Sequence, residues 1–306
     1  MQEVKSLNEI NDSLVNLLGS PIIHLEEISG GNNNRIFKIV CDDSMNYAVK
    51  FYFRNPKDRR DRLGTEFNAL RFLSSKGVKS VPMPIKADAK HGIGIYEFIE
   101  GRKIASLEIT DTDIDTAVHF VGLLKGLRAE GENAAFVPAS EAYFSVQAII
   151  ENISSRLRML TRSTADGKHH RALESYLRDD FMPLFEKVTQ RSGDRFSELG
   201  DLPEQEIAIK ERVLSPSDFG FHNTLRRNDG EIIFLDFEYF GFDDPAKLIS
   251  DFLLHPGMQL SDRLKQRFVF NILSLFEFNK RLIKRVKMLY PLFGLKWCMI
   301  LLNEFV

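Results

Sequence analysis

"LSPSDFGFHNTL", residues 214–225, is the stretch of this 306-residue sequence that best indicates its fold. It places one acid, Asp218, among turn-forming residues, and an amide, Asn223, follows five positions later. Phenylalanines stand on both sides of Gly220. Because the polar pair lies next to so much apolar side chain, the pattern predicts a loop that presents Asp218 and Asn223 at one site and is anchored by its aromatic residues.

Short apolar runs flank this stretch, at residues 212–214 and 232–235, and predict two short strands. The second run leads into "EIIFLDFEYFGFDDP", residues 231–245, in which Asp236 ends the apolar strand. An acid in such surroundings is costly unless it is paired or binds a metal ion. A second interpretation, in which Asp236 only caps the following turn, stays open.

The first third of the chain has a sequence pattern typical of a β-sheet, and the pattern of the remainder is mostly helical. β-Branched and aromatic runs separated by turn residues predict antiparallel strands within residues 22–28, 35–41, 47–53, 78–88 and 92–101. Apolar stripes predict helices within residues 6–18, 61–75, 111–128, 141–160, 169–188 and most of 246–306.

The sequence therefore predicts an α+β chain with two lobes. Residues 1–100 form a small lobe with an antiparallel sheet and one helix, and residues 101–306 form a larger, mainly helical lobe. The linker is expected near residues 100–106, where an acid and a glycine close the last strand. We expect the functional site in the cleft between the lobes.

The composition restricts the kinds of partner. A formal charge of −2 gives no global attraction to nucleic acid or to an anionic membrane. Acids and amides interrupt the N-terminal region where a signal peptide needs an unbroken apolar stretch, so we expect a cytoplasmic protein. Cys41 and Cys298 are two cysteines far apart in the sequence, and we expect both to be reduced, buried thiols.

Residues 292–306 are apolar but contain Lys296, Asn303 and Glu304, and they are fewer than the ~20 residues of a membrane-spanning helix. We expect a buried helix here and no transmembrane segment. Whether the end of the chain at Val306 is natural or truncated stays open.

Three further features suit a phosphate group. The loop "SGGNNNR", residues 29–35, is rich in residues that accept positive φ, so its N–H groups can face phosphate oxygens, although a plain hairpin turn is an open alternative. Lys50 lies inside an apolar strand, either as a phosphate ligand or as an edge residue that reaches solvent. Glu66, on the following helix, is either its partner or a solvated acid.

Taken in order, these features resemble the aminoglycoside phosphotransferase and choline kinase group, which has the protein-kinase-like fold. The resemblance extends over about residues 22–254. It is carried by the "SGGNNNR" loop, Ala48-Val49-Lys50, Glu66, the segment "YEFIEG" at 96–101, Asp218 with Asn223, and Asp236-Phe237.

The resemblance implies ATP-dependent or GTP-dependent transfer of a γ-phosphoryl group to a hydroxyl of a small molecule, with Mg²⁺. Asp218 would be the catalytic base, and Asn223 and Asp236 would hold the metal ion. Lys50, positioned by Glu66, would contact the nucleotide phosphates. The other residues implied to bind the nucleotide are Gly30, Gly31, Asn32, Asn33 and Asn34 in the loop, and Tyr96, Glu97, Phe98 and Ile99 at the hinge.

The sequence departs from the family pattern in two places. Pro216 and Ser217 stand where the family has His-Gly before the catalytic acid, and the loop at 29–35 lacks a full Gly-x-Gly-x-x-Gly. A catalytically degenerate nucleotide-binding protein is therefore the alternative function. A protein acceptor is disfavoured, because no Ala-Pro-Glu anchor follows Asp236.

An acidic group follows the proposed metal site: Glu238, Asp243 and Asp244, interleaved with aromatic residues. Acids beside aromatic rings suit a cationic or hydroxyl-rich acceptor such as an amino sugar, a sugar or an amino alcohol. The alternative is that these acids cap the helix that begins near Pro245. The sequence leaves the acceptor, the choice between ATP and GTP, and the oligomeric state open.

Overall fold

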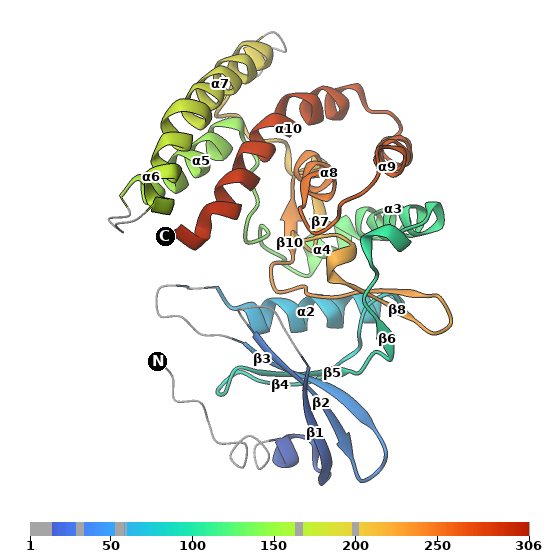
Figure 1. The fold of residues 1–306 in the computed structure, drawn as a ribbon. Helices are drawn as coiled ribbons and strands as arrows, with labels where there is room; N and C mark the ends of the chain where they lie inside the picture. The colour runs from blue at the N-terminus through green and yellow to red at the C-terminus, as the bar shows by residue number, and fades with distance from the viewer. Residues whose placement is uncertain are drawn as a thin grey trace. The chain divides into compact units, whose positions relative to one another are not determined.

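The computed structural model describes residues 14–28, 34–52, 58, 60–162, 168–197 and 202–305. The chain forms two compact units (Figure 1). The first unit spans Met1–Ile104 and also takes in Phe221–Phe240, and the second spans Ala105–Gly220 and Gly241–Val306. Phe221–Phe240, which the sequence analysis assigned to the larger helical part, thus packs with the first unit. The predicted α+β class is confirmed.

The first unit contains a five-stranded antiparallel sheet with the strand order β1-β2-β3-β5-β4. All five strands fall within the ranges predicted from the sequence or overlap them closely. Their bounds are Ile22–Ile28 for β1, Asn34–Cys41 for β2, Asn46–Tyr52 for β3, Pro84–Asp88 for β4 and Ile93–Glu97 for β5.

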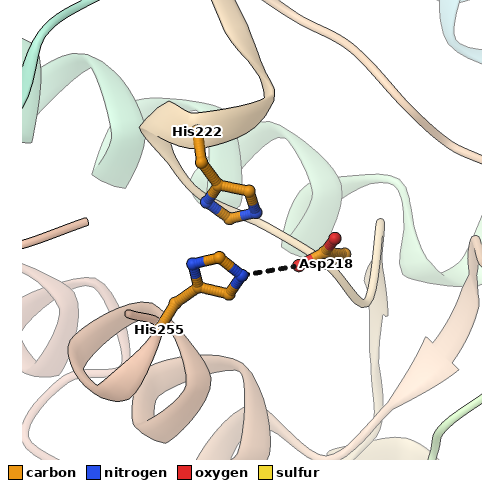
Figure 2. Close-up of side chains that lie close together, drawn as sticks. All are labelled: Asp218, His222 and His255. Carbon is orange, nitrogen blue, oxygen red and sulfur yellow. Dashed lines mark ion pairs between the residues drawn. The ribbon is translucent and has the colours of Figure 1, made fainter. Parts of the chain in front are cut away.

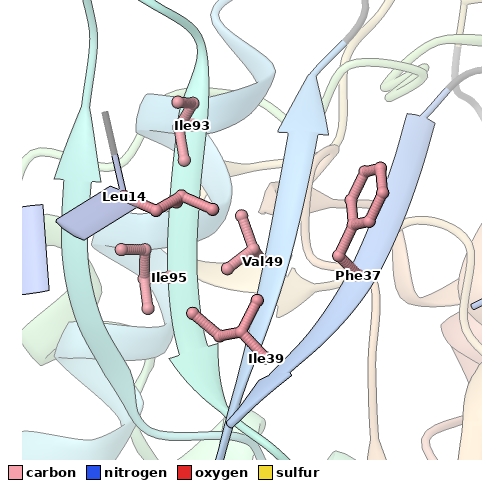
Figure 3. Packing of buried hydrophobic residues seen from close by; sticks show 6 residues of the cluster. All are labelled: Leu14, Phe37, Ile39, Val49, Ile93 and Ile95. Carbon is pink, nitrogen blue, oxygen red and sulfur yellow. The ribbon is translucent and has the colours of Figure 1, made fainter. Parts of the chain in front are cut away.

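One face of this sheet carries a buried apolar cluster (Figure 3). Its members are Leu14, from a short helical stretch at residues 14–18, and Phe37, Ile39, Val49, Ile93 and Ile95 from β2, β3 and β5. Because side chains alternate between the two faces of a strand, burying Val49 on this face turns Lys50 to the opposite face. The core packing thereby fixes the direction of Lys50.

Helix α2, Arg62–Ser75, packs against β4 and β5 of the same unit. It begins where predicted, because the side chain of Asp61 accepts a hydrogen bond from the Gly64 backbone N–H at 2.9 Å. Its buried face includes Leu63, Leu70 and Glu66. An acid on an otherwise apolar helix face requires a partner, which the site below supplies.

A second, three-stranded sheet completes the first unit, with the order β6-β8-β9. The strands are β6 at Gly101–Arg102, β8 at Thr224–Arg227 and β9 at Ile232–Phe234, and a 3-10 turn, η4 at Phe221–Asn223, precedes β8. Strand β9 confirms the prediction near residue 232. Strands β6 and β8 were missed because they are short and lack a clear alternation of apolar and polar residues.

The second unit is mainly helical. Its principal helices are α3 at Asp111–Gly126, α4 at Arg128–Asn133, α5 at Val146–Thr161, α6 at Lys168–Tyr176, α7 at Met182–Ser197, α8 at Pro245–Leu254, α9 at Asp262–Leu275 and α10 at Lys280–Leu301. Shorter helical turns are η1 at Ser106–Glu108, η2 at Leu177–Phe181, η3 at Ile209–Glu211 and η5 at Leu302–Phe305.

Two predicted helices differ from those observed. The helix expected from residue 141 begins at Val146, because the Ser145 hydroxyl accepts from the Ala148 N–H at 3.2 Å and caps it there. The helix expected over 169–188 contains a π-helical segment, η2, just before Pro183. A proline ring excludes the regular bond to residue 179, and a widened turn accommodates it.

The loop that carries Asp218 is anchored inside the second unit. Strand β7, Val213–Ser215, pairs with β10, Gly241–Asp243, and leads directly into the loop. The ring of Phe219 lies 5.8 Å from that of Phe120 and 5.4 Å from that of Phe252. The predicted anchoring of this loop by Phe219 is therefore confirmed.

The structure also tests the expectations for the two cysteines and for a membrane-spanning helix. Cys41 is buried and Cys298 is half-buried, and neither is in a disulfide, so burial was predicted correctly for Cys41 only. Within the described part of the chain, none of the helices has both the length and the apolar character that crossing a lipid bilayer requires.

Candidate active site

A buried lysine is the centre of a charge network in the first unit. The side chain of Lys50 is 9% exposed, and Nζ lies 2.7 Å from Glu66 Oε2. The same ammonium lies 2.7 Å from Asp236 Oδ1 and 3.5 Å from Glu238 Oε2. The structure thus brings together four residues that the sequence analysis singled out from distant parts of the chain.

Different elements place these side chains. Lys50 is paired with Ile36 on β2 and with Gly94 on β5, so it lies inside the sheet and not at its edge. Glu66 comes from the buried face of α2. Asp236 follows β9 with a φ of 63°, a left-handed conformation that non-glycine residues rarely adopt. Such a conformation persists only where surrounding contacts enforce it, as they do here.

Glu66 joins the lysine to the backbone that follows Asp236. Its Oε2 bonds Lys50, while its Oε1 accepts from the Phe237 N–H at 3.2 Å. The Tyr52 hydroxyl also donates to Glu66, and the Tyr52 and Tyr96 hydroxyls lie 2.6 Å apart. Tyr96, expected at the entrance of the hinge, is only 5% exposed, and its hydroxyl belongs to this network. A nucleotide-binding role for Tyr96 stays a prediction.

Burial and attraction act in opposite directions on these charges. Burial alone lowers the pKa of Lys50, but Glu66, Asp236 and Glu238 together outweigh it and raise the pKa above its ordinary value. Burial raises the pKa of Glu66, against the lowering effect of Lys50. Lys50 therefore stays a cation, which its predicted role as a phosphate ligand requires.

The hinge residues lie at the end of β5. The backbone N–H of Glu97 donates to Met83 O at 2.8 Å, so this N–H is already bonded to the residue that precedes β4. The ring of Phe98 lies 4.3 Å from Lys38 Nζ, and Ile99 is 5% exposed. Adenine binding by this segment stays a prediction.

The residues expected to bind a metal ion flank two paired strands, since Asn223 directly precedes β8 and Asp236 follows β9. The Leu235 N–H donates to Asn223 O at 2.9 Å, so Asn223 lies beside the turn that carries Asp236. Carboxylate oxygens of Glu66, Asp236 and Glu238 lie within 4.8 Å of one another. Carboxylate and amide oxygens are the donors that Mg²⁺ prefers, so the chemistry of this set fits the ion.

Glu238 is held within the same unit. Its side chain is 3% exposed and accepts from Asn34 Nδ2 at 2.8 Å and from Arg62 Nη1 at 3.3 Å. Asn34 and Arg35 are the residues of the predicted phosphate loop at 29–35 that the structure describes, and Ser29, Gly30, Gly31, Asn32 and Asn33 lie outside the described residues. Glu238 is thus connected to the Lys50 network and to the end of that loop.

Asp218 lies in the second unit, on the loop after β7, with its side chain 37% exposed. The preceding Ser217 has a φ of 70°. Its N–H donates to Ser215 Oγ at 3.0 Å, and its Oγ accepts from Lys247 Nζ at 3.2 Å. Asp218 Oδ1 itself lies 3.6 Å from His255 Nε2, as Figure 2 shows. The loop is therefore fixed directly before the predicted base.

Lys247, on α8, is a second buried cation. Its side chain is 1% exposed and lies 2.8 Å from Asp243 Oδ2 and 3.1 Å from Asp251 Oδ2. Burial alone lowers the pKa of Lys247, but the two carboxylates outweigh it and raise the pKa above its ordinary value. Burial raises the pKa of Asp243 to about 6 against the opposing effect of Lys247.

Asp244 begins α8. Its carboxylate accepts from the Ala246 N–H at 2.8 Å and lies 2.6 Å from Arg285 Nε. The interpretation of Asp244 as a helix cap is therefore confirmed. Asp243 and Asp244 are both 0% exposed and paired with cations of the same unit, and a role for them in acceptor binding stays a prediction.

The backbone at Ser217 allows a test of the departure from His-Gly. We expect Ser217→Ala to be less stable than Ser217→Gly by about 1 kcal/mol, because both lose the hydroxyl but only alanine keeps a Cβ at positive φ. Urea denaturation of the two variants measures the difference. Equal stabilities would show that this backbone carries no strain.

Several residues of both networks were not predicted from the sequence: Tyr52, Arg62, Ser217 as a hydrogen-bond acceptor, Lys247, Asp251, His255 and Trp297. A signal existed for Lys247, because Asp243 and Asp251 lie four residues before and after it, the spacing of neighbours on one helix face. No local pattern marks His255, since it reaches Asp218 only through the packing of α8.

The fold and the site define the class of the protein. A lysine on the third strand of an antiparallel sheet, paired with a glutamate on the adjoining helix, is the ion pair of protein-kinase-like enzymes. The chain belongs to the phosphotransferase enzyme family (APH), whose model matches residues 24–247. It is a small-molecule kinase, as the sequence order implied.

Solved structures agree on the fold. A spectinomycin phosphotransferase, determined with ADP and spectinomycin, has a TM-score of 0.65 at 15% identity, over 88% of this chain and 80% of that one. A choline kinase from Streptococcus pneumoniae has a TM-score of 0.61 at 16% identity, over 97% and 91%. An ethanolamine kinase from Plasmodium vivax has a TM-score of 0.59 at 17% identity, over 98% and 78%. No curated protein sequence matches the chain significantly.

Proposed function

We propose that this chain transfers the γ-phosphoryl group of ATP or GTP to a hydroxyl of a small molecule. The observation that carries the proposal is the buried Lys50, held at 2.7 Å by both Glu66 and Asp236. Phosphoryl transfer needs little covalent help from a protein, and its catalysis consists mainly of positioning and of neutralising negative charge. A fixed cation beside acids that suit a metal ion meets that need.

The contacts of the first unit support a proposed role for each of its site residues. Lys50 contacts the nucleotide phosphates, and Glu66 holds it in place. Asn223 and Asp236 would hold Mg²⁺, and Glu238, whose carboxylate lies within 4.8 Å of those of Glu66 and Asp236, would be a further oxygen donor. A bound Mg²⁺ would supply positive charge to neutralise the transferred phosphoryl group. Because Asp236 bonds Lys50 in this structure, its carboxylate is held beside the residue proposed to contact the phosphates.

Asp218 is proposed as the base. The acceptor oxygen attacks the γ-phosphorus, the bond to the bridging oxygen breaks, and the nucleoside diphosphate leaves. The acceptor hydroxyl gives up its proton to the Asp218 carboxylate. An exposed carboxylate on a well-anchored loop suits this task, because it can meet an incoming hydroxyl while keeping its position.

The acceptor is proposed to be an amino sugar, a sugar or an amino alcohol. The support is the likeness to spectinomycin, choline and ethanolamine kinases, each of which takes an acceptor of this general kind by its name. The likeness concerns the fold, so the particular acceptor is a matter for experiment.

The experiment is an acceptor panel with γ-labelled ATP and GTP in the presence of Mg²⁺. It includes aminocyclitols, choline, ethanolamine and hexoses, and a matched set with EDTA. We expect label on one acceptor class and none with EDTA. Nucleotide binding by calorimetry without transfer to any acceptor would replace the proposal by a degenerate nucleotide-binding protein. If no nucleotide binds, the roles of Lys50 and Asp236 are wrong.

A further inference from the structure

His255 lies directly after α8 and faces the predicted base. Its Nδ1 accepts a hydrogen bond from the Gly257 backbone N–H at 3.1 Å. Since a neutral imidazole has one protonated nitrogen, the ring proton is on Nε2. Nε2 lies 3.6 Å from Asp218 Oδ1 (Figure 2). The backbone thus selects the tautomer that presents an N–H toward Asp218.

A tryptophan also contacts the ring. Trp297, on α10, packs edge-on against His255 with the ring centroids 4.6 Å apart and an interplanar angle of 83°. Its Nε1–H donates to Asp251 Oδ1 at 2.8 Å. Asp251 Oδ2 in turn lies 3.1 Å from Lys247 Nζ. The imidazole therefore has little freedom to turn away from Asp218.

These contacts link up into a closed chain of interactions that begins and ends at Asp218. Lys247 bonds Asp251 on one side and the Ser217 hydroxyl on the other, and Ser217 directly precedes Asp218. One branch thus reaches Asp218 through the backbone, and the other reaches its carboxylate through Trp297 and His255. All members belong to the second unit.

We infer that His255 is a positioning residue for Asp218 in the proposed phosphoryl transfer, an inference that rests on the proposed function. An N–H directed at Oδ1 holds the Asp218 carboxylate in the orientation in which it accepts the proton of the acceptor hydroxyl. The separation of 3.6 Å is longer than a direct hydrogen bond, so the contact is an electrostatic one that shortens when the carboxylate turns toward Nε2. His255 does not itself touch the reacting atoms.

The positions of His255 and Lys247 explain how the loop that carries Asp218 is supported although it lacks the family's His-Gly. Pro216 and Ser217 supply no imidazole and no glycine before the base. Lys247 holds Ser217 in its left-handed conformation, and the imidazole that supports Asp218 comes from the end of α8. Support for the loop is thus provided by α8 instead of by the loop's own sequence.

The kinetic test compares His255→Leu, which has no donor, with His255→Gln, whose side-chain amide keeps one. With the acceptor found in the panel, we expect His255→Leu to lower kcat roughly tenfold to a hundredfold and to leave the KM for the nucleotide nearly unchanged. His255→Gln should recover part of the loss. Circular dichroism melts establish that both variants are folded.

A double-mutant cycle separates positioning from a merely structural effect. If His255 acts through Asp218, then His255→Leu should lower the residual rate of Asp218→Asn very little, because the group that it positions is already gone. Equal losses in both backgrounds would overturn the inference. His119→Leu, an exposed histidine on α3, is the matched control and should retain wild-type turnover.

A spectroscopic test is independent of turnover. Long-range ¹⁵N spectra of the imidazole should show His255 protonated at Nε2, with its signals shifted in Asp218→Asn. Protonation at Nδ1 would overturn the inference whatever the activity. If wild-type protein transfers no phosphate, the proposed function fails and the inference with it. Normal kcat in His255→Leu overturns only the inference.

Discussion

Lys247→Met is expected to lower the free energy of unfolding of the second unit by about 3–5 kcal/mol, because it leaves buried carboxylates without their cation. Lys247 is 1% exposed and lies 2.8 Å from Asp243 and 3.1 Å from Asp251. Methionine fills a similar volume, so packing changes little. The loss comes from charge.

The chain contains one tryptophan, Trp297, and it lies in the second unit beside Asp251. Its fluorescence during urea denaturation therefore reports on the part of the molecule that the substitution affects. Lys287→Met, an exposed lysine on α10, is the matched control and should change stability by no more than about 0.5 kcal/mol.

If Lys247→Met does not fold, a triple variant keeps the prediction testable. Lys247→Met combined with Asp243→Asn and Asp251→Asn removes the uncompensated charges, and it should be more stable than the single variant. A single variant that loses less than about 1 kcal/mol would show that the buried ion pairs do not hold this region together.

The two charge networks differ in how far the sequence could predict them. Lys50, Glu66 and Asp236 lie on elements whose order and patterning were clear, and the structure brings their charges to 2.7 Å. A buried lysine or glutamate is costly without a partner, so the sequence could name the two residues as a possible pair. It left open that Lys50 reaches solvent at a sheet edge, and the pairing of β3 with both β2 and β5 decides against that alternative.

The network around Asp218 could not be obtained in the same way. Ser217 has a left-handed backbone that nothing in its residue type requires, and His255 comes from a loop with no recognisable pattern. Their positions depend on how α8 and α10 pack, which is a property of the tertiary structure. Short strands such as β8 were missed for a related reason, since pairing with β9 and not local propensity defines them.

The division of the chain has a consequence for mutational analysis. The residues proposed to bind the nucleotide and metal, including Lys50 and Asp236, lie in the first unit, whereas the proposed base lies in the second. Substitutions in the two units should therefore affect different measurable quantities. Nucleotide affinity should respond to changes in the first unit, and the rate of the chemical step should respond to changes at Asp218.

Asp218→Asn is accordingly expected to lower kcat for the acceptor by about 10²- to 10⁴-fold while nucleotide affinity stays close to that of the wild type. Asparagine keeps the size and the polar contacts of the side chain but cannot accept the proton of the hydroxyl. Single-turnover transfer of the labelled γ-phosphoryl group measures the chemical step, and calorimetry measures the dissociation constant of the nucleotide.

Two comparisons make this result specific. Asp229→Asn changes an exposed acid in the turn between β8 and β9, and it should leave both quantities unchanged. Asp236→Asn should instead weaken Mg²⁺-dependent nucleotide binding, because it alters a proposed metal ligand. Acceptor-dependent transfer by Asp218→Asn within a few-fold of wild type would remove Asp218 as the base. A shared loss of nucleotide affinity in Asp218→Asn and Asp236→Asn would mean that both acids serve the metal ion.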